Sequence, residues 1–363
     1  MKIFELTKEL EKFAPLSVQE DYDNCGLIIG DPKTDIESAL ICLDLTDEIM
    51  EEAIREKHKL IISHHPIIFK GLKKINAKGL VERLVVKAIK NDIAIYAFHT
   101  NADNVILGVN EMIAKKLRMK ERKILSPKKN LLKKLVTFCP IDKAPEVRKA
   151  MFDAGGGYIG NYDQCSFNTE GIGSFRANEN ADPYVGNKNE THFEKEIRIE
   201  MIFPEYLEGN IVNALIEAHP YEEVAYDIYP LSNSFNKIGS GMIGKVEKTS
   251  VKELFKLLRA QFNCKAIRHT QILKEPIEKV AICGGSGSFL INAAKARQAD
   301  VFITGDLKYH DFFEADGQIL LVDIGHYESE QFTKELIYSI LTKKFPTFAL
   351  RISDVDTNPV NYV

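Results

Sequence analysis

Two adjacent histidines, His64 and His65, follow the apolar run at 60–62 after a single serine in "LIISHHPIIF". The proline at 66 favours an extended backbone at His65 and ends the run, so both imidazoles are predicted to lie on the loop after a buried strand. Such loops are where open α/β sheets build their sites. Taken alone, the pair is as consistent with a non-functional role, either two solvated loop histidines or a core histidine and its neighbour, as it is with a functional site.

Two further apolar runs also end in histidines and carboxylates. The segment "FHTNAD" contains His99 and Asp103, and "GHYESE" contains His326 and Glu330. Because His326 and Glu330 are four residues apart, a helix beginning there would place them on one face. Five of the nine histidines lie at predicted strand ends, which is not expected of unrelated surface residues: they are residues 64, 65, 99, 310 and 326.

These strand ends supply five candidate metal ligands: His64, His65, Asp103, His326 and Glu330. A single catalytic ion rarely takes five protein ligands and keeps an open position, whereas two ions ~3.5–4 Å apart would use them all. Each of two adjacent imidazoles can bind a different ion, and Glu330 is the candidate bridging carboxylate. Mixed nitrogen and oxygen donors favour two divalent transition metal ions per chain, Zn, Mn, Fe, Co or Ni, over Mg or Ca. Water at the open positions of such ions becomes acidic, so hydrolysis is the predicted chemistry.

A fourth strand end, "TGDLKYHD", contains Asp306 and His310. We predict a catalytic role for both, either in supporting the ligands or in proton transfer; a helix cap and a structural histidine are the alternative. His99 is expected to support the ligands rather than bind metal, because Asp103 supplies an oxygen donor in the same segment. The glycine-rich turn at 284–288 fits a phosphate site at a helix N-terminus or a tight strand-to-helix turn equally well.

Two stretches of the chain share the order of elements that would position these residues. Residues 39–66 and 279–310 each follow the pattern strand–helix–strand, and each is followed by one more strand that ends in polar residues. Units of this length imply parallel strands joined by right-handed crossovers. We therefore predict an α/β fold of two related half-domains, residues 1–127 and 236–363, that face a shared site.

Residues 128–235 follow a different pattern, βαββαβ, which is typical of a ferredoxin-like α+β domain. We predict a whole domain inserted between the halves, since insertion is tolerated at exposed loops. "HPYEEVAYD" at 219–227 lies in this insert and is not assigned to the metal site. The basic run "KKLRMKERKILSPKKN" that leads into the insert is expected to be a solvated connector, with a nucleic-acid patch as the alternative.

The overall composition excludes several classes of protein. A net charge of −4 gives no general attraction to nucleic acid or anionic membranes, although a local basic patch is not excluded. No apolar window approaches ~18 residues, and the first 15 residues form a mixed-charge amphipathic pattern that is not typical of a signal peptide. The six scattered cysteines contain no C-x-x-C pair, which argues against a disulfide framework or a zinc knuckle. We expect a reduced, cytoplasmic protein without membrane association.

The chain resembles the type 2 homologues of GTP cyclohydrolase I, also called the Nif-three-like proteins. The matching motifs spread over about residues 1–125 and 236–363: "DYDNCGLIIG" (21–30), "ISHHP" (62–66), "FHTNAD" (98–103), "TGDLKYHD" (304–311) and "GHYESE" (325–330). Within the insert, "GSF", "PYVG" and "HPYEE" resemble the PII- or CutA-like domain of the longer members. The resemblance implies a dinuclear metal site that faces the cavity of a toroidal homohexamer. The family ligands correspond to the five candidates above.

Two functions follow as hypotheses. The first is a dinuclear metal-dependent hydrolase that acts on a small molecule, either a nucleotide or a related heterocycle, through metal-activated water; a phosphoester or an amide would suit the same chemistry. The family name implies opening of the guanine imidazole ring, but a name is not evidence of substrate. The alternative is a non-catalytic oligomeric assembly protein that responds to metal or nucleotide, with the insert as sensor or lid. Turnover by purified protein separates the two hypotheses.

Overall fold

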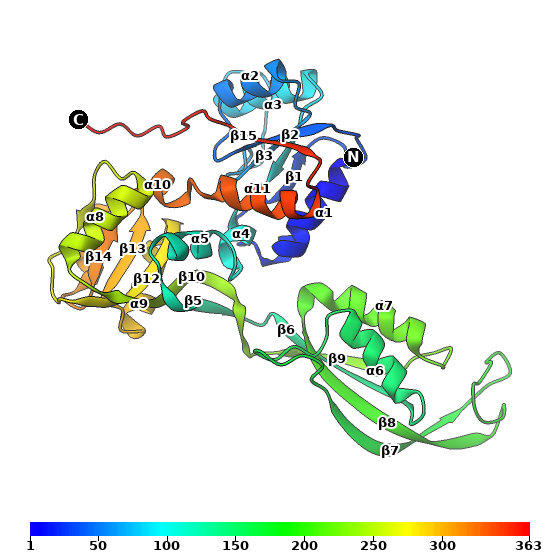
Figure 1. The fold of residues 1–363 in the computed structure, drawn as a ribbon. Helices are drawn as coiled ribbons and strands as arrows, with labels where there is room; N and C mark the ends of the chain where they lie inside the picture. Colours follow the sequence, from blue (N-terminus) through cyan, green and yellow to red (C-terminus); the bar gives the residue numbers. More distant parts are fainter. The chain divides into compact units, whose positions relative to one another are not determined.

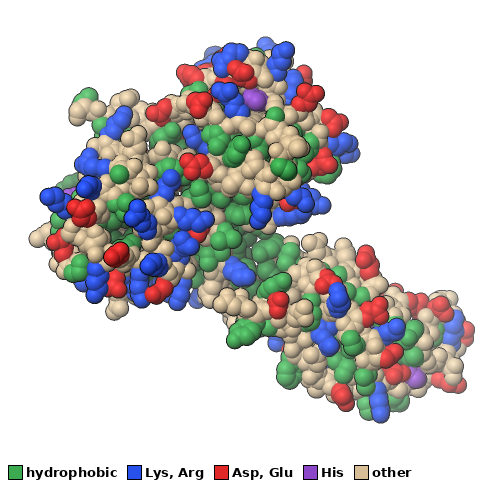
Figure 2. All heavy atoms as spheres, in the orientation of Figure 1, with side chains coloured by type: hydrophobic (Ala, Val, Ile, Leu, Met, Phe, Trp, Pro, Cys, Tyr) green, Lys and Arg blue, Asp and Glu red, His purple; other side chains and the backbone are tan.

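The computed structural model describes all 363 residues and divides the chain into two compact units (Figure 1). The first unit contains Met1–Pro127 together with Lys237–Val363, and the second contains Lys128–Asn236. The second unit covers the residues predicted as an insertion, and the metal-ligand candidates all belong to the first. No helix is both long enough and apolar enough to cross a membrane. Lys, Arg, Asp and Glu are interspersed over the face drawn in Figure 2, in keeping with the small net charge.

The first unit contains two sheets, of which the first has five strands. The three central strands of this sheet, β2, β3 and β4, run parallel to one another. Every residue of β3 and β4 is buried. Continuous apolar runs of this kind are typical of parallel strands covered on both faces. Figure 1 shows α2 and α3 on one face of this sheet and α1 and α11 on the other. The strand order is β1 (Gly26–Ile29), β4 (Ala94–Ala97), β3 (Leu60–Ser63), β2 (Ser38–Cys42) and β15 (Ala349–Ile352); the helices are α1 (Ile3–Phe13), α2 (Asp47–Arg55), α3 (Leu80–Lys90) and α11 (Thr333–Lys344).

The second sheet of this unit has six strands, with β12, β13 and β14 parallel. One apolar core lies between this sheet and helices α5 and α8, and a second lies on the side of α9. The order is β11 (Arg268–His269), β14 (Leu320–Asp323), β13 (Val301–Gly305), β12 (Ile277–Ser286), β10 (Ser234–Thr249) and β5 (Lys120–Lys129). The associated helices are α4 (Thr100–Asn104), α5 (Val109–Lys116), α8 (Val251–Phe262), α9 (Ile291–Ala296), α10 (His326–Glu330) and the 3-10 helix η4 (Tyr309–Ala315).

Each sheet takes an outer strand from the other part of the chain. Strand β15, near the C-terminus, pairs in parallel with β2, and β5 comes from the N-terminal part but lies at the edge of the second sheet. The two halves are therefore not formed by 1–127 and 236–363 as separate segments. The physical reason is that an edge strand offers unpaired backbone groups to any strand that reaches it, whichever segment supplies that strand.

The second unit is a four-stranded antiparallel sheet covered by two helices. The chain order is β6 (Leu132–Pro140), α6 (Ala144–Asp153), β7 (Phe167–Arg176), β8 (Thr191–Pro204), α7 (Glu208–Ala218) and β9 (Tyr226–Leu231). The strand order β7-β8-β6-β9 is the ferredoxin-like arrangement. Residues that alternate along β6 and β8, such as Leu135, Ile199 and Met201, form the core with the two helices. The opposite face of the sheet is left without a helix.

Candidate metal centre

The two adjacent histidines lie directly after the central strand β3. The backbone N–H groups of His64 and His65 both donate to the carbonyl of Leu43 at 3.1 Å, which ties this loop to the end of the neighbouring strand β2. Asp103 lies in α4, the short helix that follows β4. Because β3 and β4 are parallel neighbours, their polar ends reach the same edge of the sheet.

The remaining two candidates come from the second sheet. His326 is the first residue of α10 and Glu330 is the last, and this helix follows β14. Gly325 precedes the helix at a φ of 96°, a conformation that side chains disfavour. The helix brings both side chains to one point, since His326 Nε2 lies 2.9 Å from Glu330 Oε2.

The five predicted ligands converge in space as two groups that share Glu330. Potential ligand atoms of His65, His326 and Glu330 all lie within 4.8 Å of one another, and so do those of His64, Asp103 and Glu330. Glu330 Oε2 lies 3.1 Å from His65 Nε2 and 3.6 Å from His64 Nε2. A carboxylate common to two groups is the arrangement that a bridging ligand requires.

Three buried polar atoms at this point have no hydrogen-bond partner: His64 Nε2, Asp103 Oδ1 and Glu330 Oε2. An unsatisfied buried polar group typically costs about 1–3 kcal/mol, and more when it is charged. Nitrogens approach Glu330 Oε2 closely, but not in a direction that makes a hydrogen bond. Atoms that point at a common centre without bonding one another fit a divalent cation there, and imidazole with carboxylate is a donor set suited to transition metals.

Each of the three histidines is oriented through its other ring nitrogen. His64 Nδ1 lies 2.8 Å from the carbonyl oxygen of Phe98, His65 Nδ1 lies 2.7 Å from Asp44 Oδ1, and a third contact of 2.7 Å joins His326 Nδ1 to Asp306 Oδ2. When Nδ1 donates to these oxygens, Nε2 is left with its lone pair for a metal. Asp306 therefore supports a candidate ligand, and Asp44 is a supporting residue that sequence reasoning missed.

A second supporting group surrounds His99. Its Nδ1 lies 2.8 Å from Asp23 Oδ1, and its ring lies 5.1 Å from the ring of His64. Asp23 also accepts hydrogen bonds from the backbone and the hydroxyl of Thr100. Asp23 belongs to the motif "DYDNCGLIIG" but received no role in the sequence analysis. Its only local signal was its place in that motif, three residues before the start of β1.

His310 is not brought to the cluster. It lies exposed on η4, and its ring contacts those of Tyr309 and Phe313, 5.2 Å and 6.1 Å away. None of the polar contacts of the cluster involves it. The catalytic role predicted for His310 has no geometric support, because the chain turns away after Asp306, whose φ is 56°, and the 3-10 helix then carries His310 to the surface.

The ionisable groups of the cluster shift one another's pKa values, and the histidine neighbours of Glu330 have a large effect on its buried carboxylate. Burial would raise its pKa, but the neighbouring rings of His326 and His64 hold the pKa well below its usual range. Burial would likewise lower the pKa of His65, yet the hydrogen bond to Asp44 and the negative charge of nearby Glu330 outweigh it and raise this pKa to about 10. Burial raises the pKa of Asp103 to about 7, although the ring of His64 opposes the shift. The charged form of Glu330 is thus favoured by the rings that surround it.

The glycine-rich segment supports Glu330, and two of its N–H groups are already paired within the protein. The N–H of Gly284 donates to Asn110 Oδ1 at 3.1 Å, and that of Gly285 donates to Ser329 Oγ at 2.9 Å. A Cβ at Gly285 would collide with the carboxylate of Glu330. Of the two alternatives for residues 284–288, the tight turn accounts for these contacts.

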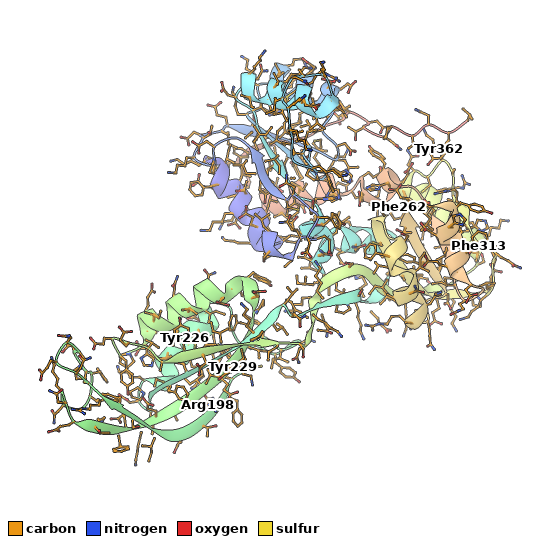
Figure 3. The ribbon with its side chains drawn as sticks, turned by 180° about the vertical axis from the view of Figure 1, so that it is seen from behind. Arg198, Tyr226, Tyr229, Phe262, Phe313 and Tyr362 are labelled. Carbon is orange, nitrogen blue, oxygen red and sulfur yellow. The ribbon has the colours of Figure 1, made fainter.

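A cavity of about 870 Å³ adjoins the cluster. His65 and His326 form one side of it, and Phe69, Tyr327 and Tyr362 contribute aromatic surface. Tyr362, labelled in Figure 3, belongs to the C-terminal segment that follows β15. That segment returns to the site, since Thr357 donates to Asp44 Oδ2 at 3.0 Å, the same carboxylate that orients His65.

Comparison with known proteins places the chain in a family. The model of the Duf34/NIF3 (NGG1p interacting factor 3) family matches residues 1–359. A protein of Bacillus subtilis (strain 168) named GTP cyclohydrolase 1 type 2 homolog is 38% identical over 361 residues, which cover 97% of this chain and 96% of that protein. The crystal structure of a Bacillus cereus protein related to NIF3 has a TM-score of 0.88 at 36% identity and covers 100% of this chain and 99% of its own.

The crystal structure of a Staphylococcus aureus protein gives a TM-score of 0.78 at 29% identity. The match covers 100% of this chain and 99% of the Staphylococcus aureus chain. These matches extend across both segments of the first unit and through the inserted one. They confirm the resemblance that the sequence motifs indicated. The chain belongs to the Duf34/NIF3 family.

Proposed function

We propose that this protein is a dinuclear metal-dependent hydrolase whose substrate is a nucleotide or a related heterocycle. The observation that carries the proposal is the position of Glu330, which is shared by two groups of candidate ligands while its Oε2 has no hydrogen-bond partner. His65 and His326 complete one group, and His64 and Asp103 complete the other.

When bound, two divalent cations would supply an acidic water and positive charge beside the substrate. The chain itself would do the positioning. Asp44 and Asp306 fix the ring orientations of His65 and His326, and the carbonyl of Phe98 fixes that of His64. Such supporting contacts typically change metal affinity or activity by about 10–100-fold when they are removed.

The aromatic lining of the adjoining cavity suits a flat substrate, and lysines lie on the segment after His65 although not in that lining. The aromatic side chains of Phe69, Tyr327 and Tyr362 offer apolar surface to a heterocycle in the adjoining cavity. The segment that connects His65 to α3 forms no helix or strand and contains four lysines that form no ion pair: Lys70, Lys73, Lys74 and Lys78. Long irregular segments beside a site often bind ligands, and these ammonium groups would attract phosphates.

The name of the Bacillus subtilis relative makes guanine nucleotides the first substrates to test. Purified protein loaded separately with Zn and Mn would be incubated with GTP, other nucleotides, phosphoesters and cyclic amides, and the products separated by chromatography. We expect metal-dependent consumption of at least one compound. Binding of a nucleotide without consumption by metal-loaded protein would contradict the hydrolase and favour the non-catalytic assembly protein.

The proposal includes the toroidal homohexamer that the resemblance implies, and a PII- or CutA-like character for the inserted unit. Light scattering coupled to size-exclusion chromatography tests the assembly. A monomer or a dimer at micromolar concentration would contradict the hexamer while leaving the metal centre of each chain in place.

A further inference from the structure

The inserted unit contains a cavity of about 620 Å³ that is made entirely from its own residues. It lies on the face of the sheet that α6 and α7 leave uncovered, because its strand residues alternate with those that pack against the helices. Two connecting segments, represented by Tyr184 and Tyr221, form its walls. Nothing in the metal centre requires this cavity.

Two glycines on β7 create the floor of the cavity. Gly171 has no atom within 4 Å of the position that a Cβ would take, and its partner across the strands is Glu196 on β8. At Gly173, a Cβ would collide with the carboxylate of Glu196. Glycine weakens a strand interior and often marks the close approach of another group. Here the two missing side chains leave room for one carboxylate and for open space beside it.

Glu196 is the buried charged group of the cavity. Its residue is 9% exposed, and Oε1 accepts a hydrogen bond from the hydroxyl of Tyr221 at 2.9 Å. No Lys, Arg or His forms an ion pair with it. Arg198, two residues further along β8 and labelled in Figure 3, also lines the cavity, but it pairs with Glu200 at 2.8 Å. A buried carboxylate without a cationic partner is costly, which makes it a receptor for a cation.

The walls are aromatic as well as acidic. The ring of Tyr221 lies 6.4 Å from that of Phe175 and 6.1 Å from that of Tyr184, and all three line the cavity. Aromatic faces attract ammonium and guanidinium groups. Glu170, Glu222 and Glu223 also line the cavity, so its charge is unfavourable for phosphates.

We propose that this cavity binds an organic cation, with its ammonium or guanidinium group against Glu196 and its apolar body between the rings of Phe175, Tyr184 and Tyr221. The site is independent of the proposed hydrolase function. Its ligand class is set by the buried carboxylate together with the aromatic walls, and a neutral molecule of the same shape would lack the main interaction.

The test uses the full chain and two probes of nearly identical shape, benzamidine, which is a planar cation, and benzamide, which is neutral. Calorimetry or NMR titration should show benzamidine binding at least about tenfold more tightly, a difference of about 1.4 kcal/mol. Glu196→Gln keeps the shape of the side chain and should remove this preference. Glu217→Gln, on the exposed surface of α7, is the matched control and should retain it.

A second variant keeps the test informative if Glu196→Gln is poorly folded. Gly171→Val adds a strand-favouring side chain into open space and should fill the cavity without a clash, so that benzamidine no longer binds. Thermal melting with circular dichroism monitors the fold of each variant. Equal affinity for the two probes, no binding of benzamidine, or unchanged binding by both Glu196→Gln and Gly171→Val would overturn the proposal.

Discussion

At the scale of single residues, the metal centre depends on one carboxylate. Glu330 is 3% exposed, contacts histidines of both ligand groups and has an oxygen without a hydrogen-bond partner. Burial would raise its pKa, but the neighbouring rings of His326 and His64 hold that pKa well below its usual range. A residue in this position is expected to control how much metal the chain holds rather than how stable the helix is.

We predict that Glu330→Gln loses at least one of two metal equivalents and most hydrolytic activity while the fold is retained. The amide keeps the shape but removes the charge that offsets two mutually repelling cations. Elemental analysis together with thermal melting checks this prediction. The control is Glu335→Gln, at an exposed position on α11. If Glu330 acted only through the helix dipole, an effect of about 0.3–1 kcal/mol, metal content would stay unchanged and only the melting temperature would fall slightly.

The adjacent histidines should be separable by substitution. His65 groups with His326 and Glu330, whereas His64 groups with Asp103 and Glu330. We expect His65→Ala and His64→Ala each to retain about one metal equivalent, with the retained ion held by the other group. Elemental analysis of protein saturated with Zn gives the stoichiometry. If the unsubstituted protein bound only one metal ion per chain when saturated with each of several metals in turn, the dinuclear centre would be rejected.

At the scale of elements, the glycine-rich end of β12 is fitted to the carboxylate of α10. Gly285 has a φ of 60°, and a Cβ there would strike Glu330, whereas Gly317 has a φ of 63° with nothing within 4 Å. We predict that Gly285→Ala lowers both stability and metal content. Gly317→Ala should incur only the backbone cost, about 1–2 kcal/mol, with metal content intact. Equal metal content in the two variants would show that the turn does not position Glu330.

The start of β12 is held by the carboxylate of Asp300, which precedes β13. Asp300 accepts from the backbone N–H groups of Glu278 and Lys279 and from Lys274 Nζ, at 2.6–2.9 Å. Burial would raise the pKa of Asp300, but these hydrogen bonds lower it. A pKa lowered by folding contributes stability above the unfolded-state pKa of about 3.9, and this contribution is lost as the pH falls through the lower, folded-state pKa.

Asp300→Asn should therefore lower the melting temperature at pH 7 and have a smaller effect near pH 3. Melting curves across this range test the prediction, with the exposed Asp92→Asn as the control. A difference between Asp300→Asn and the unsubstituted protein that stays constant down to pH 3 would mean that the charge of Asp300 contributes nothing.

Local sequence patterns predicted the ends of β3, β4 and β14 well, because buried parallel strands are short apolar runs and their polar ends stand out. The convergence of His64 and Asp103 followed from the rule that parallel strands share an edge, whereas the approach of Glu330, from the other sheet, followed only from the prediction of two halves that face a shared site. The exchange of β5 and β15 between sheets could not be predicted in this way, since strand pairing is non-local. Asp44 was missed because a carboxylate after a strand has many ordinary roles, and the exposed position of His310, away from the cluster, could not be predicted because the path of η4 depends on packing.

At the scale of the whole molecule, the inserted unit is a self-contained body attached at two neighbouring strands. Strands β5 and β10, from which it departs and to which it returns, are adjacent in the second sheet. At the junction, Gly239 lies so close to Pro127 that a Cβ would meet its backbone at 2.7 Å. The insert also has an apolar core of its own around Leu135, Val147 and Phe203.

We predict that replacing residues 128–235 by a short Gly/Ser linker leaves a folded first unit that still binds metal. Because the ends to be joined are close, the entropy of closing the linker is small and grows by only about 0.6 kcal/mol for each doubling of its length. Circular dichroism and elemental analysis of the shortened chain check fold and metal content together.

The same deletion also bears on the cation site. The shortened chain should lose the preference for benzamidine over benzamide completely, since every residue of that cavity is removed, while Glu330 and its partners stay in place. A shortened chain that folds but loses its metal would mean that the insert supports the centre through contacts that the first unit cannot replace. A shortened chain that keeps both the metal and the benzamidine preference would place the cation site in the first unit, contrary to the role inferred for Glu196.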